Sequence, residues 1–212
     1  LQSTAVEGCS AVRAPPGTVR LGVSRMAVEQ GMTLRTPIFV GIDLGTSGVK
    51  AIAVDSAGRV VGSASCALDF DRPRQGWAET PPLRWWEATT AATRSLLADG
   101  VDATSIAAVG LSGQMHGSVF IARAALDRAG TDAIDAIRPA LMWNDQRTES
   151  SLGHIESALG DRAACVERTG CPPLTGLTAP KLDWLRTHEP KHAERIAAMC
   201  LPKDYLALAL TG

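Results

Sequence analysis

The chain has 212 residues, of which 45% are hydrophobic and 20% charged, and its formal net charge is −1. This is the composition of an ordinary globular protein, and a chain of this length buries a full core without disulfides or metals. A charge near zero gives no electrostatic reason to expect nucleic acid or an anionic membrane as a partner. The sequence also has no run of about 18 apolar residues that would span a bilayer.

The cysteines and the two ends of the sequence carry further expectations. None of the five cysteines belongs to a CxxC pair, so neither a disulfide framework nor a zinc ribbon is expected. Reduced thiols are typical of the cytoplasm, which we predict as the location. We interpret residues 1–36 as a disordered tail or an over-extended start, with Met26 or Met32 as the first natural residue. Because the sequence stops at Thr211 and Gly212 directly after an apolar run, we expect it to be a fragment.

Ordered structure is predicted to begin with three short strands. They are a β-branched run at 38–42, an alternating segment at 49–54 and a third segment at 60–68, separated by turn signals at 45–48 and 55–58. Parallel neighbours need a crossover of about a dozen residues, so strands joined this closely are predicted to form an antiparallel meander.

The apolar spacing then changes from that of a strand to that of a helix. A helix is predicted after Thr80, an N-cap candidate followed by Pro81 at the first helical position, and Gly100 suits its end. Four residues define the predicted buried face of this helix: Trp85, Thr89, Ala92 and Leu96.

Strands and helices alternate in the rest of the chain. Two further strands are predicted at 106–111 and 139–143, with a surface excursion over 122–137 between them. Helices are predicted over four ranges: 148–159, 180–188, 191–199 and 202–210. The order of elements fits a mixed sheet with helices on its faces, an α/β domain that we assign to residues 37–212.

The first segment with recognisable chemistry lies between the first two strands, and it reads DLGTSGVK over residues 43–50. Its glycines let the backbone approach a ligand, while its N–H groups and hydroxyls suit phosphate oxygens. Asp43 suits Mg²⁺ or the waters around it, and an ordinary hairpin turn with a solvated Asp43 is the alternative. The segment is neither a Walker loop nor a Rossmann fingerprint. The predicted contacts for the nucleotide phosphates are Gly45, Thr46, Ser47 and Lys50.

A second polar segment, GQMHG over residues 113–117, directly follows the fourth strand. Ligands bind at strand ends in α/β sheets, and glycines on both sides permit close approach. Gln114 and His116 offer donors and acceptors that suit a polyhydroxylated ligand. Taken alone, however, such a residue is more often an ordinary loop histidine than a ligand contact.

A third polar segment, WNDQR over residues 143–147, follows the fifth strand. Asn144 and Asp145 suit bidentate contacts with vicinal hydroxyls, and we name Arg147 as a further sugar contact. The alternative is that Asp145 caps the helix predicted to start at Thr148, and one residue can serve both roles. A fourth segment, LPKDYL over residues 201–206, is by itself a helix initiated by proline with an apolar face.

Taken together and in this order, the segments resemble the FGGY family of carbohydrate kinases, and within it the xylulokinase subfamily. The resemblance covers residues 38–212. Its hallmarks are GIDLGTSGVKA (41–51), GQMHG (113–117), LMWNDQR (141–147), TAPKLDWLRTHEP (178–190) and LPKDYLALALTG (201–212).

The resemblance implies a ribonuclease H-like, actin-like ATPase fold, of which an intact kinase has two domains flanking a cleft. It also implies phosphorylation of the ketose D-xylulose, with ATP and Mg²⁺ as cofactors and a homodimer as a candidate assembly of the intact enzyme. In this family the catalytic base and most of the nucleotide site lie beyond the point that matches Gly212. We therefore expect the second, nucleotide-binding domain to be absent and the 212-residue chain alone to be inactive.

The resemblance also assigns roles to individual residues. Asp43 matches the aspartate that acts with Mg²⁺ on the transferred phosphoryl group. Met115 and His116 match the pair that contacts the ketose, and Asn144 and Asp145 match further polar contacts around the sugar.

Two other functions remain open from the sequence. One is a related FGGY kinase for ribulose, fuculose, rhamnulose or glycerol, although GQMHG favours xylulose. The other is a non-catalytic actin-like ATPase or sensor module, although the two polar loops fit sugar binding better than filament contacts. A pseudogene product without function is a third alternative.

Overall fold

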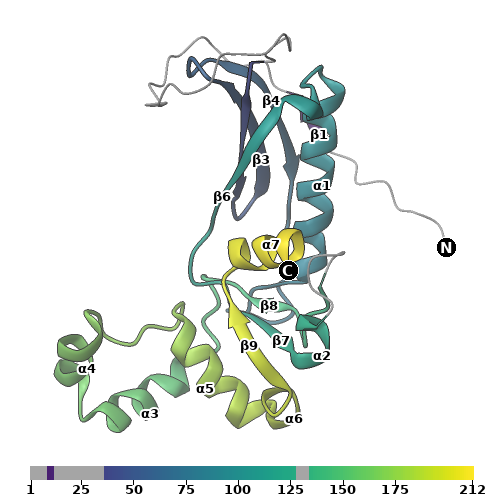
Figure 1. Cartoon of the computed structure of the whole chain (residues 1–212). Coiled ribbons are helices and arrows are strands. Elements are labelled where there is room, and N and C mark those ends of the chain that lie inside the picture. Colours follow the sequence, from purple (N-terminus) through teal and green to yellow (C-terminus); the bar gives the residue numbers. More distant parts are fainter. Residues whose placement is uncertain (1–8, 12–35, 128–133) are drawn as a thin grey trace. The chain divides into compact units, whose positions relative to one another are not determined.

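The computed structural model describes residues 9–11, 36–127 and 134–212, and most of its elements are labelled in Figure 1. Two compact units divide the chain, one of Leu1–Leu68 with Glu87–Gly113 and the other of Asp69–Trp86 with Gln114–Gly212. We refer to them as the first and second unit. The assignment of residues 37–212 to one domain stays a prediction. None of the helices in the described ranges is long and apolar enough to cross a membrane.

The first unit contains a five-stranded sheet in the order β1-β4-β3-β2-β6. The predicted antiparallel meander is confirmed and consists of β2 (Ile38–Leu44), β3 (Gly48–Asp55) and β4 (Val60–Ala67). Strand β6 (Ile106–Gly113) follows a helical crossover and runs parallel to β2, so the sheet is mixed, as predicted.

Helix α1 (Pro82–Ala98) and a short 3-10 helix, η1 (Ala103–Ser105), precede β6. The four residues predicted for the buried face of α1 are all buried. A methyl group added to Gly62 of β4 would lie 3.1 Å from Leu96 Cδ1 and 2.8 Å from Val101 Cγ2, so these side chains pack directly on the sheet. The predicted helix start is wrong by one residue, because Thr80 lies in a strand and Pro82 is the first helical residue.

Strand β1 (Cys9–Ala11) pairs antiparallel with β4 at the edge of the sheet. These three residues fall in the stretch that the sequence assigned to a disordered tail. Residues 1–8 and 12–35 lie outside the described ranges, so the tail assignment for them stays a prediction.

Two antiparallel strand pairs organise the second unit. Strand β5 (Glu79–Thr80) pairs with β8 (Ala140–Leu141). Strand β7 (Val119–Ala122) pairs with β9 (Ile196–Cys200), and these two lie side by side in Figure 1. The strand predicted at 139–143 is therefore present but short. The helix predicted over 191–199 is wrong beyond α6 (Pro190–Ala193), because the residues after it form β9.

The remaining helices of the second unit are α2 (Arg123–Leu126), α3 (Glu149–Leu159), α4 (Arg162–Thr169), α5 (Thr178–His188) and α7 (Pro202–Thr211). Helix α4 was not predicted, and Asp161 caps it by accepting a hydrogen bond from Ala164 N at 2.8 Å. Helix α2 and the last residue of β7, Ala122, fall within the predicted surface excursion, of which residues 128–133 lie outside the described ranges. The core cluster comprises Phe120, Leu141, Trp184 and Leu185.

Candidate functional site

A tight turn joins β2 to β3 in the first unit. Gly45 N donates to Gly48 O at 2.9 Å. A methyl group added at Gly45 would lie 3.1 Å from Gly48 O, and one at Gly48 would lie 2.9 Å from Cys66 O. Close backbone approach therefore requires glycine at both positions, which fits a phosphate-binding turn and an ordinary hairpin equally.

Asp43 and Lys50 flank this turn on the exposed side of the sheet. They are direct cross-strand partners, and Ser112 of β6 neighbours Asp43 on its other side. Directly paired residues project from the same face of a sheet, and all three residues line an open hollow of about 700 Å³. The described residues hold no cluster of three or more metal-ligating side chains. A single exposed carboxylate such as Asp43 nevertheless fits Mg²⁺ that keeps waters and takes phosphate oxygens as ligands.

In the second unit, the two polar loops predicted to bind sugar lie side by side. Ser118 N donates to Leu141 O at 2.9 Å, and Leu141 N donates to Ser118 O at 3.2 Å. The first loop ends immediately before Ser118, and the second begins two residues after Leu141. Within this pair of loops, Met115 is 65% exposed and Asn144 Oδ1 is buried without a hydrogen-bond partner among the described residues.

His116 and Gly117 give the first loop its particular backbone. Among the described residues other than glycine, His116 alone has a positive φ, of 62°. His116 is exposed, and its backbone carbonyl oxygen accepts a hydrogen bond from Lys181 Nζ. A methyl group on Gly117 would lie 2.6 Å from Pro202 Cγ, so the first residue of α7 packs against the loop.

The LPKDYL segment thus packs against the GQMHG loop through Pro202. Farther along α7, Tyr205 is fully buried, its ring meets Trp85 edge-on, and its hydroxyl donates to Ile134 O at 2.9 Å. Burial raises the pKa of Tyr205 to about 12. The prediction of a helix initiated by proline is confirmed, and the structure adds its contact with the GQMHG loop.

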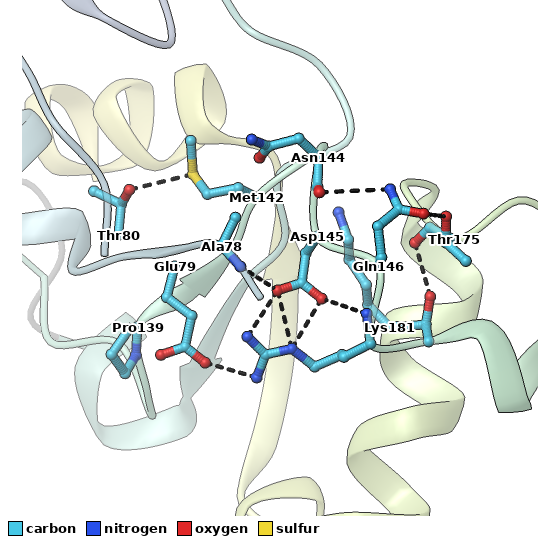
Figure 2. A network of polar contacts seen from close by, with 12 residues as sticks. Ala78, Glu79, Thr80, Pro139, Met142, Asn144, Asp145, Gln146, Thr175 and Lys181 are labelled. Atoms are coloured by element: carbon cyan, nitrogen blue, oxygen red, sulfur yellow. Dashed lines mark hydrogen bonds and ion pairs between the residues drawn. The ribbon is translucent and has the colours of Figure 1, made fainter. Parts of the chain in front are cut away.

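Asp145 is the centre of a buried polar network, shown in Figure 2. Its side chain is fully buried and its carboxylate accepts hydrogen bonds from Ala78 N at 2.7 Å and from Arg147 N at 3.0 Å. The Arg147 guanidinium adds contacts of 2.7 Å from NH2 and 2.9 Å from Nε. The alternative that Asp145 caps the next helix is wrong, because Thr148 occupies the N-cap of α3.

Arg147 extends the network to residues distant in the sequence. Its NH1 forms an ion pair with Glu79 at 2.6 Å, and its guanidinium lies 3.6 Å from the centroid of the Trp77 ring. Arg138 also pairs with Glu79 and with Glu189. Asp145 and Arg147 therefore hold the second loop against the segment at residues 77–80. Their predicted role as sugar contacts stays a prediction.

Sequence reasoning did not identify Lys181 or Gly176, although both lie at the same loops. Lys181 falls within the TAPKLDWLRTHEP segment, which was the one sign of its importance. Gly176 lies just before that segment, and a methyl group added to it would lie 2.2 Å from Trp143 O.

We expect Gly176→Ala to destabilise the chain by about 2 kcal/mol or more, because the Trp143 backbone would have to shift away from the new methyl group. The matched control is Gly153→Ala in α3, where an added methyl group has nothing within 4 Å. That change is expected to stabilise by roughly 0.5–1 kcal/mol, because alanine is the better helix former. Urea unfolding measures both changes, and equal effects would contradict the assigned contact.

Comparison with known proteins decides the family. The model for the N-terminal domain of the FGGY family of carbohydrate kinases matches residues 38–212. The chain belongs to this family. FGGY kinases have an actin-like ATPase fold, and the mixed sheet with its helices agrees with the fold class predicted from the sequence.

The FGGY relatives include several proteins named xylulose kinase. The chain is 38% identical over 176 residues to that of Escherichia coli, covering 82% of this chain and 34% of the relative. It is 39% identical over 179 residues to that of Streptomyces coelicolor, covering 83% and 34%. A crystal structure of a "xyloylose kinase" from Brucella ovis matches with a TM-score of 0.72 and 37% identity, over 81% of this chain and 34% of that one. The chain thus spans about a third of the length of these FGGY relatives.

Proposed function

We propose that this chain is the N-terminal, sugar-binding part of a xylulokinase, which transfers a phosphoryl group from ATP to D-xylulose to give D-xylulose 5-phosphate. The main support for this proposal is the pair of polar loops joined at Ser118 and Leu141, in a chain 38% identical to a protein named xylulose kinase. We further propose a cytoplasmic location, no nucleic-acid or membrane partner, and a homodimer for the intact enzyme.

The β2–β3 turn is the proposed phosphate side of the reaction. Phosphoryl transfer depends mainly on positioning and on charge stabilisation. Asp43 would hold Mg²⁺ through its waters, and the bound ion would neutralise phosphate charge. The backbone at Gly45, the hydroxyls of Thr46 and Ser47 and the Lys50 ammonium would contact phosphate oxygens.

The two loops of the second unit are the proposed sugar side. Gln114, Met115 and His116 would line one part of the ketose site. Asn144 Oδ1, which is buried and lacks a partner among the described residues, would accept a hydrogen bond from a sugar hydroxyl and so remove the cost of an unpaired polar atom. Asp145 and Arg147 would form the base of the site and hold Asn144 in place.

We expect the 212-residue chain alone to show negligible kinase turnover. The proposed catalytic base and most of the nucleotide site belong to a part of the relatives that this chain does not match. A positioned base is worth ~10²–10⁴-fold in rate, and loss of proximity costs up to ~7–11 kcal/mol. A coupled ADP-release assay with D-xylulose measures the rate, and ordinary kinase turnover would contradict this division of labour.

The sugar-binding role itself is tested on the same chain by NMR titration with D-xylulose. We expect shifts of the Gly117 and Asn144 amides that saturate, with glycine amides remote from the loops, such as that of Gly153, unchanged. Ribulose, fuculose, rhamnulose and glycerol form the comparison panel. Stronger binding of one of these would redirect the proposal to another FGGY kinase, and no binding by any of them would favour a sensor module.

A further inference from the structure

Lys181 is a buried cation for which no role has yet been assigned. It lies in α5, its exposure is 0%, and it ranks among the largest fully buried side chains of the described residues. A buried ammonium is costly unless its N–H groups are satisfied. Its Nζ donates to two backbone carbonyls, that of His116 and that of Gly176, the second at 2.8 Å.

These two carbonyls belong to segments 60 residues apart in the sequence, and both segments border the proposed sugar site. The loop at Gly176 lies against the second polar loop, since a methyl group added to Gly176 would lie 2.2 Å from Trp143 O. Thr175 of the same loop donates to Gln146 Oε1 at 2.6 Å, as Figure 2 shows. Lys181 therefore joins the first polar loop to the structure that supports the second.

The lysine donates to a residue with an unfavourable backbone conformation. A histidine with φ of 62° lies in the left-handed region, which is unfavourable for residues with a Cβ and persists only when surrounding contacts impose it. A charge-assisted hydrogen bond to the carbonyl of that same residue is such a contact. The backbone conformation of His116 also sets the direction in which its exposed imidazole points.

We propose that Lys181 is a positioning residue, which ties the His116 carbonyl to the Gly176 loop and so fixes the imidazole for contact with the ketose. The effect on sugar affinity rests on the function proposed above, whereas the tie between the two loops does not.

Protonation of Lys181 gives the tie a pH dependence. Burial lowers the pKa of Lys181 from 10.5 to about 7, with Asp145 raising the pKa and Arg147 lowering it. As pH rises through about 7, the ammonium becomes a neutral amine, which is a weaker donor. Asp145 and Arg147 are the charged groups that act on Lys181, whereas the His116 carbonyl that accepts its hydrogen bond carries no charge.

The lowered pKa of Lys181 makes the stability of the fold depend on pH. Between the folded value of about 7 and the unfolded value of 10.5, the unfolded chain holds a proton that the folded chain has lost. Stability therefore rises with pH across this interval through Lys181. Below about 7 both states are protonated, and the folded state carries the full desolvation cost of the cation.

The test compares Lys181→Met, which keeps the length of the side chain without its charge, with Lys191→Met on the exposed surface of α6. We expect Lys181→Met to move the amide signals of Gly117 and Gly176 and to weaken D-xylulose binding about 10- to 100-fold. It should also remove the rise in urea midpoint between pH 7 and 10.5. Lys191→Met should change none of these quantities.

The wild-type chain provides a second measurement that needs no folded variant. The chain has four lysines, whose ¹³Cε signals the experiment follows one by one. We expect that of Lys181 to titrate near pH 7, with the Gly117 and Gly176 amides following it. Gly117 and Gly176 amides that do not follow the Lys181 ¹³Cε signal, or that stay unchanged in Lys181→Met, would overturn the proposal. If no ketose binds the wild-type chain, the sugar function fails while the amide shifts still decide whether Lys181 ties the loops.

Discussion

Asp145→Asn is expected to lower the free energy of unfolding by about 3–5 kcal/mol, because breaking a buried ion pair leaves the partner charge uncompensated. Asp145 is fully buried, and the guanidinium of Arg147, whose side chain is 1% exposed, would retain only Glu79 as an ionic partner. Asparagine would also present an N–H group where Ala78 N now donates at 2.7 Å. Urea unfolding followed by far-ultraviolet circular dichroism measures the loss.

The matched control for this substitution is Asp69→Asn, because the Asp69 side chain is 87% exposed. Exposed substitutions of this kind stay within about 0.5 kcal/mol. A loss below about 1 kcal/mol in Asp145→Asn would mean that the buried network does not support the second loop. Because Asp145→Asn is expected to lose much of its stability, reduced sugar binding in this variant would not by itself identify a sugar contact.

Asp43→Ala is expected to lower kcat for D-xylulose by at least about 10²–10³-fold, the usual cost of removing one preorganised electrostatic group from a transition state. The variant is made in a chimera in which residues 38–212 replace the matching part of the Escherichia coli xylulose kinase. Asp43 is exposed at the end of β2, so the substitution should leave the urea midpoint almost unchanged. A coupled assay for ADP release measures turnover.

Asp99→Asn, at an exposed position just beyond α1, is the control in the same chimera and should keep full turnover. Wild-type turnover in Asp43→Ala would remove Asp43 from the phosphate site and leave the β2–β3 turn as an ordinary hairpin. A raised requirement for Mg²⁺ in the variant would instead agree with the proposed role of the carboxylate.

Local patterns in the sequence were sufficient for the first sheet. The turns between β2, β3 and β4 are too short for a crossover, so antiparallel pairing followed from chain length alone. The buried face of α1 likewise followed from helical spacing, because Trp85, Ala92 and Leu96 repeat with the period of a helix.

Long-range pairing explains where the sequence was misleading. Residues 191–199 are rich in alanine and have good helix propensity, yet Ile196–Cys200 pairs with Val119–Ala122, more than 70 positions earlier. Such pairing overrides weak local preferences. Strand β7, the partner of β9, was also missed, because a run of four apolar residues has no diagnostic period.

The candidate site shows the same division between local and distant contacts. The polar loops could be found because their residue types are unusual after apolar strands. That Asp145 is buried could not be predicted, because its donors include Ala78 N and its arginine partner pairs with Glu79, both far away in the sequence. Lys181 was missed because its bonds go to the backbone at His116 and Gly176, which leaves no trace in side-chain patterns.

The indole rings around Arg147 give the second unit a built-in optical reporter. Trp77 and Trp184 meet edge-to-face with ring centroids 5.7 Å apart, and the Arg147 guanidinium lies over both, 3.6 Å from the first centroid and 5.1 Å from the second. A fixed positive charge this close to an indole shifts its emission, so the tryptophan fluorescence of the chain should respond when the guanidinium moves. Events at the sugar loops can thus be followed without attaching a dye.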